Sequence, residues 1–174
     1  LTDTQDITNS LFDNKGRAGH AEIITTNSLN QFVDKQLIDY LSYDRFGNVT
    51  HQTVERLDEA GVLLDYKDIE NKYDNDAAAK RGNATLTTIN RYSSKDTRDS
   101  TTFIECQKIY NDEFDNLGNV VRQRIETYDS IAADTLAKKT EIHNYLISNS
   151  GDAGEQHISS YIYESGLAIL VSYQ

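Results

Sequence analysis

The sequence predicts an all-β protein, built as an antiparallel meander of tandem β-hairpin repeats. A phrase of the form aromatic-Asp-x-x-Gly-Asn-apolar occurs twice with little change, as YDRFGNV from Tyr43 and as FDNLGNV from Phe114. The segments between such phrases are rich in Tyr, Thr, Val and Ile, which are the residues that favour strands. Short clusters of Gly, Asn, Asp and Ser separate these segments and indicate turns.

The composition favours sheets that are wet on at least one face. Hydrophobic residues make up 37% of the 174 residues, below the roughly 45–50% apolar usage of ordinary domains. Eleven tyrosines and many β-branched residues nevertheless argue against disorder. A polar chain of this kind gains stability from strand pairing and from stacking of repeats more than from a thick core.

Three further copies of the phrase are less regular. The copy FDNKGRA has Arg17 in place of Asn, and an insert at 77–81 separates the two halves of the copy that begins at Tyr73. The stretch YLISNSGDAGEQ from Tyr145 reads as a degenerate fifth copy, with Gly154 as its expected turn glycine. The whole chain, 1–174, is then a single repeat region of about five units, at about 12–42, 43–72, 73–113, 114–144 and 145–174.

The phrase residues are expected to have structural roles in the turns. Gly-Asn before a strand tolerates left-handed backbone angles, and the Asp can accept hydrogen bonds from backbone amides of the turn. The aromatic residue is expected to pack on its equivalent in the neighbouring repeat unit. The residues in these roles are Phe12, Asp13, Gly16, Tyr43, Asp44, Gly47, Asn48, Tyr73, Asp74, Gly82, Asn83, Phe114, Asp115, Gly118 and Asn119.

Each repeat unit reads as turn, strand, turn, strand, which gives ten strands. They are expected near 17–25, 31–42, 48–57, 62–73, 83–92, 101–110, 119–128, 136–147, 155–163 and 167–173. The stretch DTLAKKTEIHNYL also fits a helix, but its place in the repeat favours a strand.

The spaced phrases resemble the YD repeat of the Rhs family, from about Phe12 to the end of the chain. That family includes bacterial polymorphic toxins, the shell components of insecticidal toxin complexes, and teneurins. The resemblance implies a β-sheet strip that spirals into a hollow shell, and hence a non-catalytic segment of a secreted or cell-surface protein. The chain departs from the family in its insert, its degenerate fifth copy and its lack of the Pro-rich self-cleaving region.

A second interpretation is a cell-surface adhesin or glycan-binding module built from the same repeats. An enzyme is not predicted, because the sequence shows no nucleophile–base pair, phosphate loop or paired-carboxylate motif. Cys106, in an apparent strand, reads as a packed residue and not as a catalytic thiol.

Metal ligands are also not predicted. His20, His51 and His157 follow turn glycines at similar spacings, but repeats stacked side by side do not gather three imidazoles at one ion. His143 and these three are read as strand residues. No cofactor is expected; weak Ca²⁺ binding by acidic stretches such as 111–116 is the alternative left open.

The charge of the chain limits its partners. A net charge of −11 disfavours nucleic acid, and no apolar stretch is long enough to span a membrane. The lone cysteine excludes an intrachain disulfide. The absence of Met, Pro and Trp leads us to expect a segment of a longer polypeptide.

The last strand is expected to carry assembly. LAILVSY, 167–173, is the most hydrophobic β-prone window, and it has no charged residue after Glu164. A strand of this kind at a sheet edge is a template for pairing. We expect Leu167, Ile169 and Val171 to lie at an edge that pairs with flanking repeats of a longer chain or with another copy, giving a filament or ring.

Overall fold

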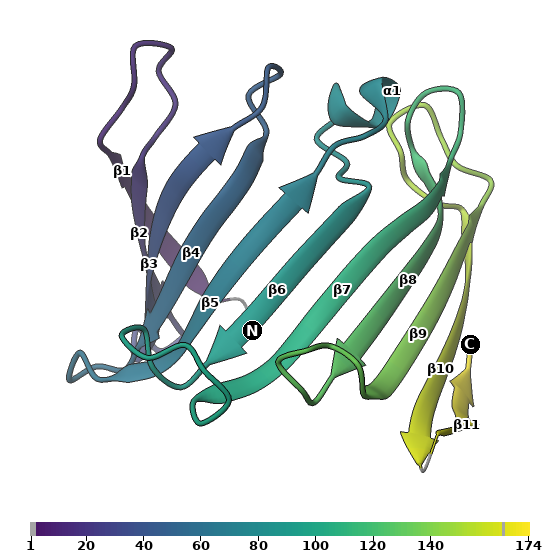
Figure 1. Cartoon of the computed structure of the whole chain (residues 1–174). Helices are drawn as coiled ribbons and strands as arrows, with labels where there is room; N and C mark the ends of the chain where they lie inside the picture. The colour runs from purple at the N-terminus through teal and green to yellow at the C-terminus, as the bar shows by residue number, and fades with distance from the viewer. Residues whose placement is uncertain (1–2, 165) are drawn as a thin grey trace. The chain divides into compact units, whose positions relative to one another are not determined.

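The computed structural model describes residues 3–164 and 166–174. The described chain forms one antiparallel sheet of eleven strands that follow one another in sequence order (Figure 1). The strands are β1 (Thr4–Ser10), β2 (His20–Thr26), β3 (Phe32–Tyr43), β4 (Val49–Leu57), β5 (Leu63–Lys72), β6 (Leu86–Tyr92), β7 (Phe103–Phe114), β8 (Val120–Tyr128), β9 (Leu136–Tyr145), β10 (Glu155–Glu164) and β11 (Leu167–Tyr173). The expected all-β antiparallel meander is confirmed.

The structure has one strand more than the sequence predicted. β1 precedes the first copy of the phrase, so the repeat pattern gave no signal for it. It pairs with β2, placing Ile7 opposite Ile23, and β2, the first strand that the sequence predicted, is therefore an interior strand. The ambiguous stretch at 136–147 forms a strand, β9, as expected.

The insert forms the helix α1 (Asp76–Ala79). The side chain of Asn75 caps it by accepting hydrogen bonds from the backbone N–H groups of Ala77 and Ala78, both at 3.0 Å. Two of its alanines, Ala78 and Ala79, are almost completely buried. No helix in the described part of the chain is long and apolar enough to cross a membrane.

The apolar interior is thin, because every described strand belongs to the same single sheet. Aliphatic side chains meet in cross-strand pairs, with Ile38 opposite Val54 on β3 and β4 and Ile109 opposite Ile125 on β7 and β8. Such directly opposed pairs are the unit of sheet stabilisation. The fold is therefore held mainly by strand pairing and by its turns.

The chain forms two compact units, one of 1–69 with 91–104 and the other of 70–90 with 105–174. In compact unit 1, the carboxylate of Asp65 is 1% exposed and bonds two arginines. Its Oδ2 lies 2.8 Å from Arg56 Nη2 and 2.9 Å from Arg91 Nη2. Its Oδ1 has no hydrogen-bond partner among the described residues, so the two guanidinium groups supply all the compensation that this carboxylate receives.

In compact unit 2, a second polar network lies along β8. Buried Glu126 accepts hydrogen bonds from Arg124 Nη1 at 2.6 Å and from the Tyr128 hydroxyl at 2.5 Å. Burial, followed by the hydrogen bond to Glu126, raises the pKa of Tyr128, which therefore stays protonated as a donor.

Candidate functional site

The second phrase copy forms a three-residue hairpin loop closed by its aspartate. Asp44 Oδ1 accepts hydrogen bonds from the backbone N–H groups of Phe46 at 2.8 Å and Asn48 at 2.9 Å. Asp44 Oδ2 accepts one from Asn48 Nδ2 at 2.8 Å. Gly47 has φ of 90°, the left-handed residue that this loop type requires. The phrase aspartate and asparagine thus lock the turn between them.

The other regular copy has the same geometry, and the first copy keeps it in modified form. Asp115 Oδ1 accepts from the backbone of Leu117 at 2.8 Å and Asn119 at 2.9 Å, and its Oδ2 accepts from Asn119 Nδ2 at 2.8 Å. In the first copy, Arg17 stands in for the asparagine and donates from Nε to Asp13 Oδ2 at 2.7 Å. The substitution in that copy therefore preserves the side-chain bond across the turn.

The copy with the insert is built differently. Asp74 does not close a turn; its Oδ2 accepts a hydrogen bond from Thr85 Oγ1 at 3.3 Å. Asn83 donates from Nδ2 to the backbone carbonyl of Gly118 at 2.9 Å, and so bonds to the next phrase turn along the chain. The phrase residues Tyr73 and Gly82 flank α1, with Gly82 at a φ of 78°.

In the fifth copy, the prediction that Gly154 is the turn glycine was wrong. The turn glycine is Gly151, which has φ of 98°. Ser148 replaces the aspartate and accepts from the Asp152 backbone at 3.1 Å. Gly154 instead donates its N–H to the carbonyls of Tyr145 and Leu146. The sequence held the signal for this register, since 11–19 and 146–154 share the spacing L-x-x-N-x-G-x-A-G.

Turns at the other ends of the hairpins use the same bonds, although they lack the phrase. Asn27 Oδ1 accepts from the backbone of Leu29 at 2.9 Å and Gln31 at 3.0 Å. Asp58 Oδ1 accepts from the Val62 backbone at 2.8 Å. The sequence predicted turns at these stretches but not the roles of Asn27 and Asp58. An Asn or Asp at the start of each turn, four residues before the residue whose backbone N–H it accepts, could have indicated these roles.

Successive hairpins are joined by recurring backbone bonds. In compact unit 1, the N–H of Tyr40 donates to the Gly19 carbonyl at 2.9 Å, three residues after the turn glycine Gly16. In compact unit 2, the N–H of Asn111 donates to the Thr85 carbonyl at 3.0 Å, three residues after Gly82. The two junctions therefore have equivalent register.

At these junctions a side chain donates a second hydrogen bond, to the carbonyl of the residue just before the one that accepts the backbone bond. The Tyr43 hydroxyl donates to the Ala18 carbonyl at 2.5 Å, and Asn111 Nδ2 donates to the Ala84 carbonyl at 2.6 Å. Asn144 Nδ2 makes the corresponding bond to Val120 at 2.9 Å. These three bonds tie β3, β7 and β9 to the ends of the phrase turns that lead into β2, β6 and β8.

The ring of Tyr43 shows what the phrase aromatic contacts. The guanidinium of Arg17 lies 4.4 Å from its centroid, and the ring of Tyr40 on the same strand lies at 6.3 Å. Tyr43 thus packs on the arginine of the preceding turn, a cation–π contact, whereas the sequence predicted packing on the equivalent aromatic of the neighbouring repeat unit.

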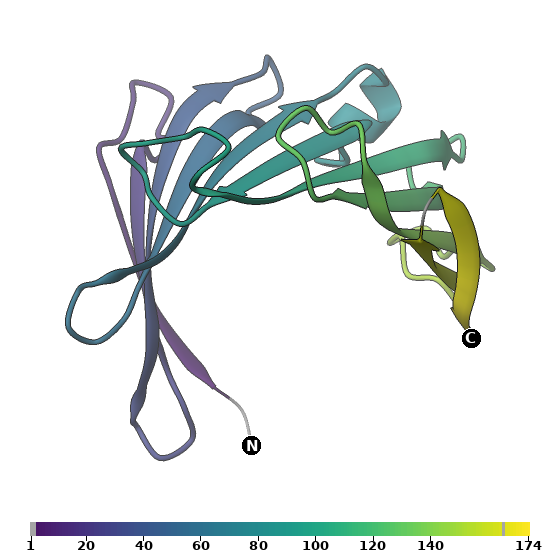
Figure 2. The ribbon, with the colours of Figure 1, turned by 60° about the horizontal axis from the view of Figure 1, so that its bottom comes forward.

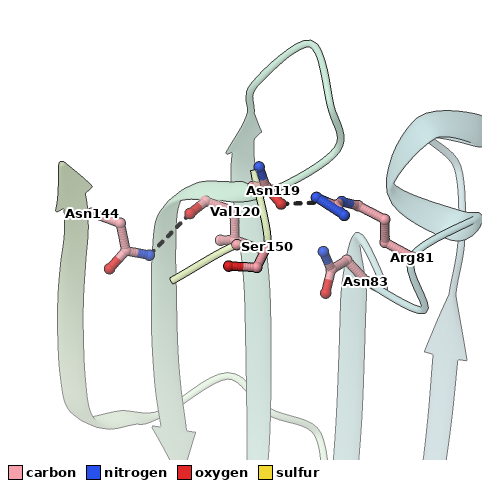
Figure 3. A pocket seen from close by; sticks show the side chains of 7 residues that line it. Arg81, Asn83, Asn119, Val120, Asn144 and Ser150 are labelled. Atoms are coloured by element: carbon pink, nitrogen blue, oxygen red, sulfur yellow. Dashed lines mark hydrogen bonds between the residues drawn. The ribbon is translucent and has the colours of Figure 1, made fainter. Parts of the chain in front are cut away.

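A polar hollow of about 260 Å³ lies among the turns of compact unit 2 (Figure 3). Arg81 donates from Nε to Asn119 Oδ1 at 3.1 Å and from Nη2 to the Asn149 carbonyl at 2.5 Å. Asn83 and Asn144 also line it, each held by its bond to a backbone carbonyl. The arrangement fastens the insert to two later turns, and its amide and guanidinium groups offer hydrogen bonds. The Ser150 hydroxyl also lines the hollow and bonds Ser148 and Asp152.

The four histidines lie on separate strands. His20 bonds Asp39, His51 bonds Asp68 and His157 bonds Glu155, each at 2.7 Å. His143 stacks on Tyr145. Within the described ranges, no group of three or more His, Cys, Asp or Glu side chains is placed to hold a metal ion.

Cys106 and the acidic stretch at 111–116 have structural surroundings. Cys106 is 2% exposed, and burial raises the pKa of its thiol, which disfavours the reactive thiolate. Asp112 faces Arg124, while Asp115 closes its turn, so these carboxylates point to different partners.

We expect the phrase aspartates to make stability depend on acid pH. Hydrogen bonds from the Arg17 backbone and then its side chain lower the pKa of Asp13 from 3.8 to about 2, and the Asn119 side chain lowers the pKa of Asp115. A carboxyl with a depressed folded pKa stabilises the fold above its unfolded pKa and loses that contribution as pH falls through the folded value. The urea midpoint should therefore fall between pH 3.8 and about pH 2, and less so in an Asp13→Asn/Asp115→Asn variant. Glu59→Gln, in an exposed turn, is the control; an equal fall in all three proteins would contradict this role.

No protein-family model matches the chain, and no curated protein matches it. The resemblance to YD repeats therefore stays a prediction from the sequence.

Proposed function

We propose that the chain is a non-catalytic structural segment of a larger Rhs/YD-repeat wall, shell or filament, secreted or on a cell surface. The observation that supports this proposal is the repeated junction, in which β3 and β7 bond with the same register to the ends of the phrase turns that precede β2 and β6. A sheet built by one repeated junction can be extended by adding further hairpins, with stability set by nearest neighbours.

The free edge of β11 supports continued growth. β3 and β9 are each followed by a phrase turn and then by a further paired strand, β4 and β10, whereas β11 would occupy the same place as β3 and β9 in the next repeat unit. β11 pairs with β10 and ends the described sheet (Figure 2). Its side chains are open to solvent, with Leu167 72%, Ile169 43% and Val171 52% exposed. An apolar edge without charge favours pairing with another strand.

We predict that the Ile169→Lys/Val171→Lys variant is monomeric under conditions in which the parent associates. Two lysines at the edge repel a second strand and stay hydrated. Mass measured by light scattering over a concentration series tests this. The matched control is Leu41→Lys/Leu64→Lys, which places the same charges on exposed positions of interior strands. A parent that stays monomeric at high concentration would overturn edge assembly.

A second proposal is a surface adhesin or glycan-binding module, which a row of aromatic rings favours. The ring centroids of Tyr145 and His157 are 4.9 Å apart, and those of His157 and Tyr173 are 6.1 Å apart. Tyr145 is 44% and Tyr173 is 66% exposed. Open aromatic faces beside polar groups suit the apolar faces of sugar rings.

A further inference from the structure

Three basic side chains lie in one row across β8, β9 and β10. Arg122 is directly opposite His143, and His143 is directly opposite His157. Directly opposed residues share one face of a sheet, with neighbouring strands about 4.8 Å apart. The row continues into the aromatic rings of Tyr145 and Tyr173, because Tyr145 stacks on His143 and Tyr173 contacts His157.

The row borders a hollow of about 360 Å³ in compact unit 2. Two carboxylates line this hollow, and each has its own cation. Glu141 is 2.8 Å from Lys139 Nζ, and Asp112 is 3.3 Å from Arg124 Nε. The acidic groups of the hollow are therefore already compensated.

Arg122 and His143 differ from these neighbours. Both line the hollow, yet within residues 3–164 and 166–174 neither makes an ion pair or a side-chain hydrogen bond. Glu113 lies opposite Arg122 across a β-bulge without bonding to it. An exposed guanidinium that keeps all its donors is available to bind a negatively charged group.

We propose that this face binds a carboxylate-bearing sugar, with its carboxylate on Arg122 and His143 and its ring along the aromatic row. A guanidinium binds a carboxylate through two parallel hydrogen bonds. The rings of Tyr145, His157 and Tyr173 supply flat surfaces for the pyranose. This inference rests on the glycan-binding proposal and is independent of assembly through β11.

The surrounding charges favour a carboxylate over a phosphate. Asp112 and Glu141 line the hollow, and Glu155 bonds the neighbouring His157. A dianion meets more repulsion from these carboxylates than a singly charged group does. The aromatic row contributes contact area to a sugar ring and none to an inorganic ion.

The test is a titration of the full chain with glucuronate, glucose or inorganic phosphate, followed by amide chemical shifts. Glucuronate should give saturable shifts on β8 to β11, with weaker binding of the other two probes. Arg122→Gln should weaken glucuronate binding about tenfold or more, the scale of a lost charged hydrogen bond. The matched control is Arg45→Gln, which removes the same charge in compact unit 1 and should leave binding unchanged.

Tyr173→Ala separates the ring contact from the charge contact. It should weaken glucuronate binding and leave the weak phosphate binding as it was. Phosphate as tight as glucuronate, or an Arg122→Gln variant that binds glucuronate normally, would overturn the proposed site. Equal binding of glucose and glucuronate would overturn the carboxylate contact while supporting a glycan-binding face. An absence of shifts with every sugar would count against the carboxylate contact and against the glycan-binding proposal. Light scattering on the same samples tests assembly through β11 separately.

Discussion

Replacing both Arg56 and Arg91 with Gln is expected to lower the free energy of unfolding by about 3–5 kcal/mol, the scale for breaking a buried ion pair. Asp65 is 1% exposed, and its Oδ2 bonds Arg56 Nε at 3.0 Å and Arg91 Nη2 at 2.9 Å. Without either guanidinium the carboxylate has no counter-charge, and its Oδ1 already has no partner among the described residues. The chain must then carry an uncompensated buried charge or protonate it, and both cost stability.

A second variant separates the cost of an unpaired buried charge from the cost of lost side-chain packing. Arg56→Met/Arg91→Met/Asp65→Leu removes the whole network, and replacement of buried ion pairs by apolar residues of similar size is often close to neutral. We expect its urea midpoint to lie near that of the parent and well above that of the double Gln variant. The control removes the surface pair Lys35–Glu22, which should cost no more than about 1 kcal/mol. A double Gln variant as stable as this control would show that Asp65 is solvated.

The network around Asp65 illustrates what the sequence could not predict. Its partners lie 9 and 26 residues away on two other strands. The two arginines reach Asp65 only when the three strands pair in one particular register. A one-residue slip of a strand turns every side chain to the opposite face, and the sequence alone did not fix that register. The same limit hid the row formed by Arg122, His143 and His157.

The phrase turns could be predicted because their chemistry is local. The Asp44 carboxylate reaches amides two and four residues ahead, so the order of residues alone implied the bonds. Positive φ at Gly47 and Gly118 was expected for the same reason and is confirmed. β1 and the register of the fifth copy were missed because both lie where the phrase is absent or altered.

The last prediction compares two glycines that occupy the same turn position. Gly47 and Gly118 have φ of 90° and 82°, so an alanine at either position takes a left-handed conformation. That conformation costs an L-residue about 1–2 kcal/mol. Nothing lies within 4 Å of a methyl group added at Gly47, whereas one added at Gly118 would lie 2.5 Å from the carbonyl carbon and oxygen of Ala77.

We therefore expect Gly118→Ala to destabilise the protein more than Gly47→Ala does. Overpacking typically adds about 1–3 kcal/mol, so Gly118→Ala should cost roughly 2–5 kcal/mol in all. The clash is with the backbone of the first turn of α1, which cannot move aside without disturbing buried Ala78 and the Asn75 cap. Urea midpoints of both variants measure the difference, and the amide shifts of 75–83 should change in Gly118→Ala alone. Equal midpoints would mean that α1 does not sit against this turn in solution, and that the insert is held by Arg81 and not by packing on the phrase.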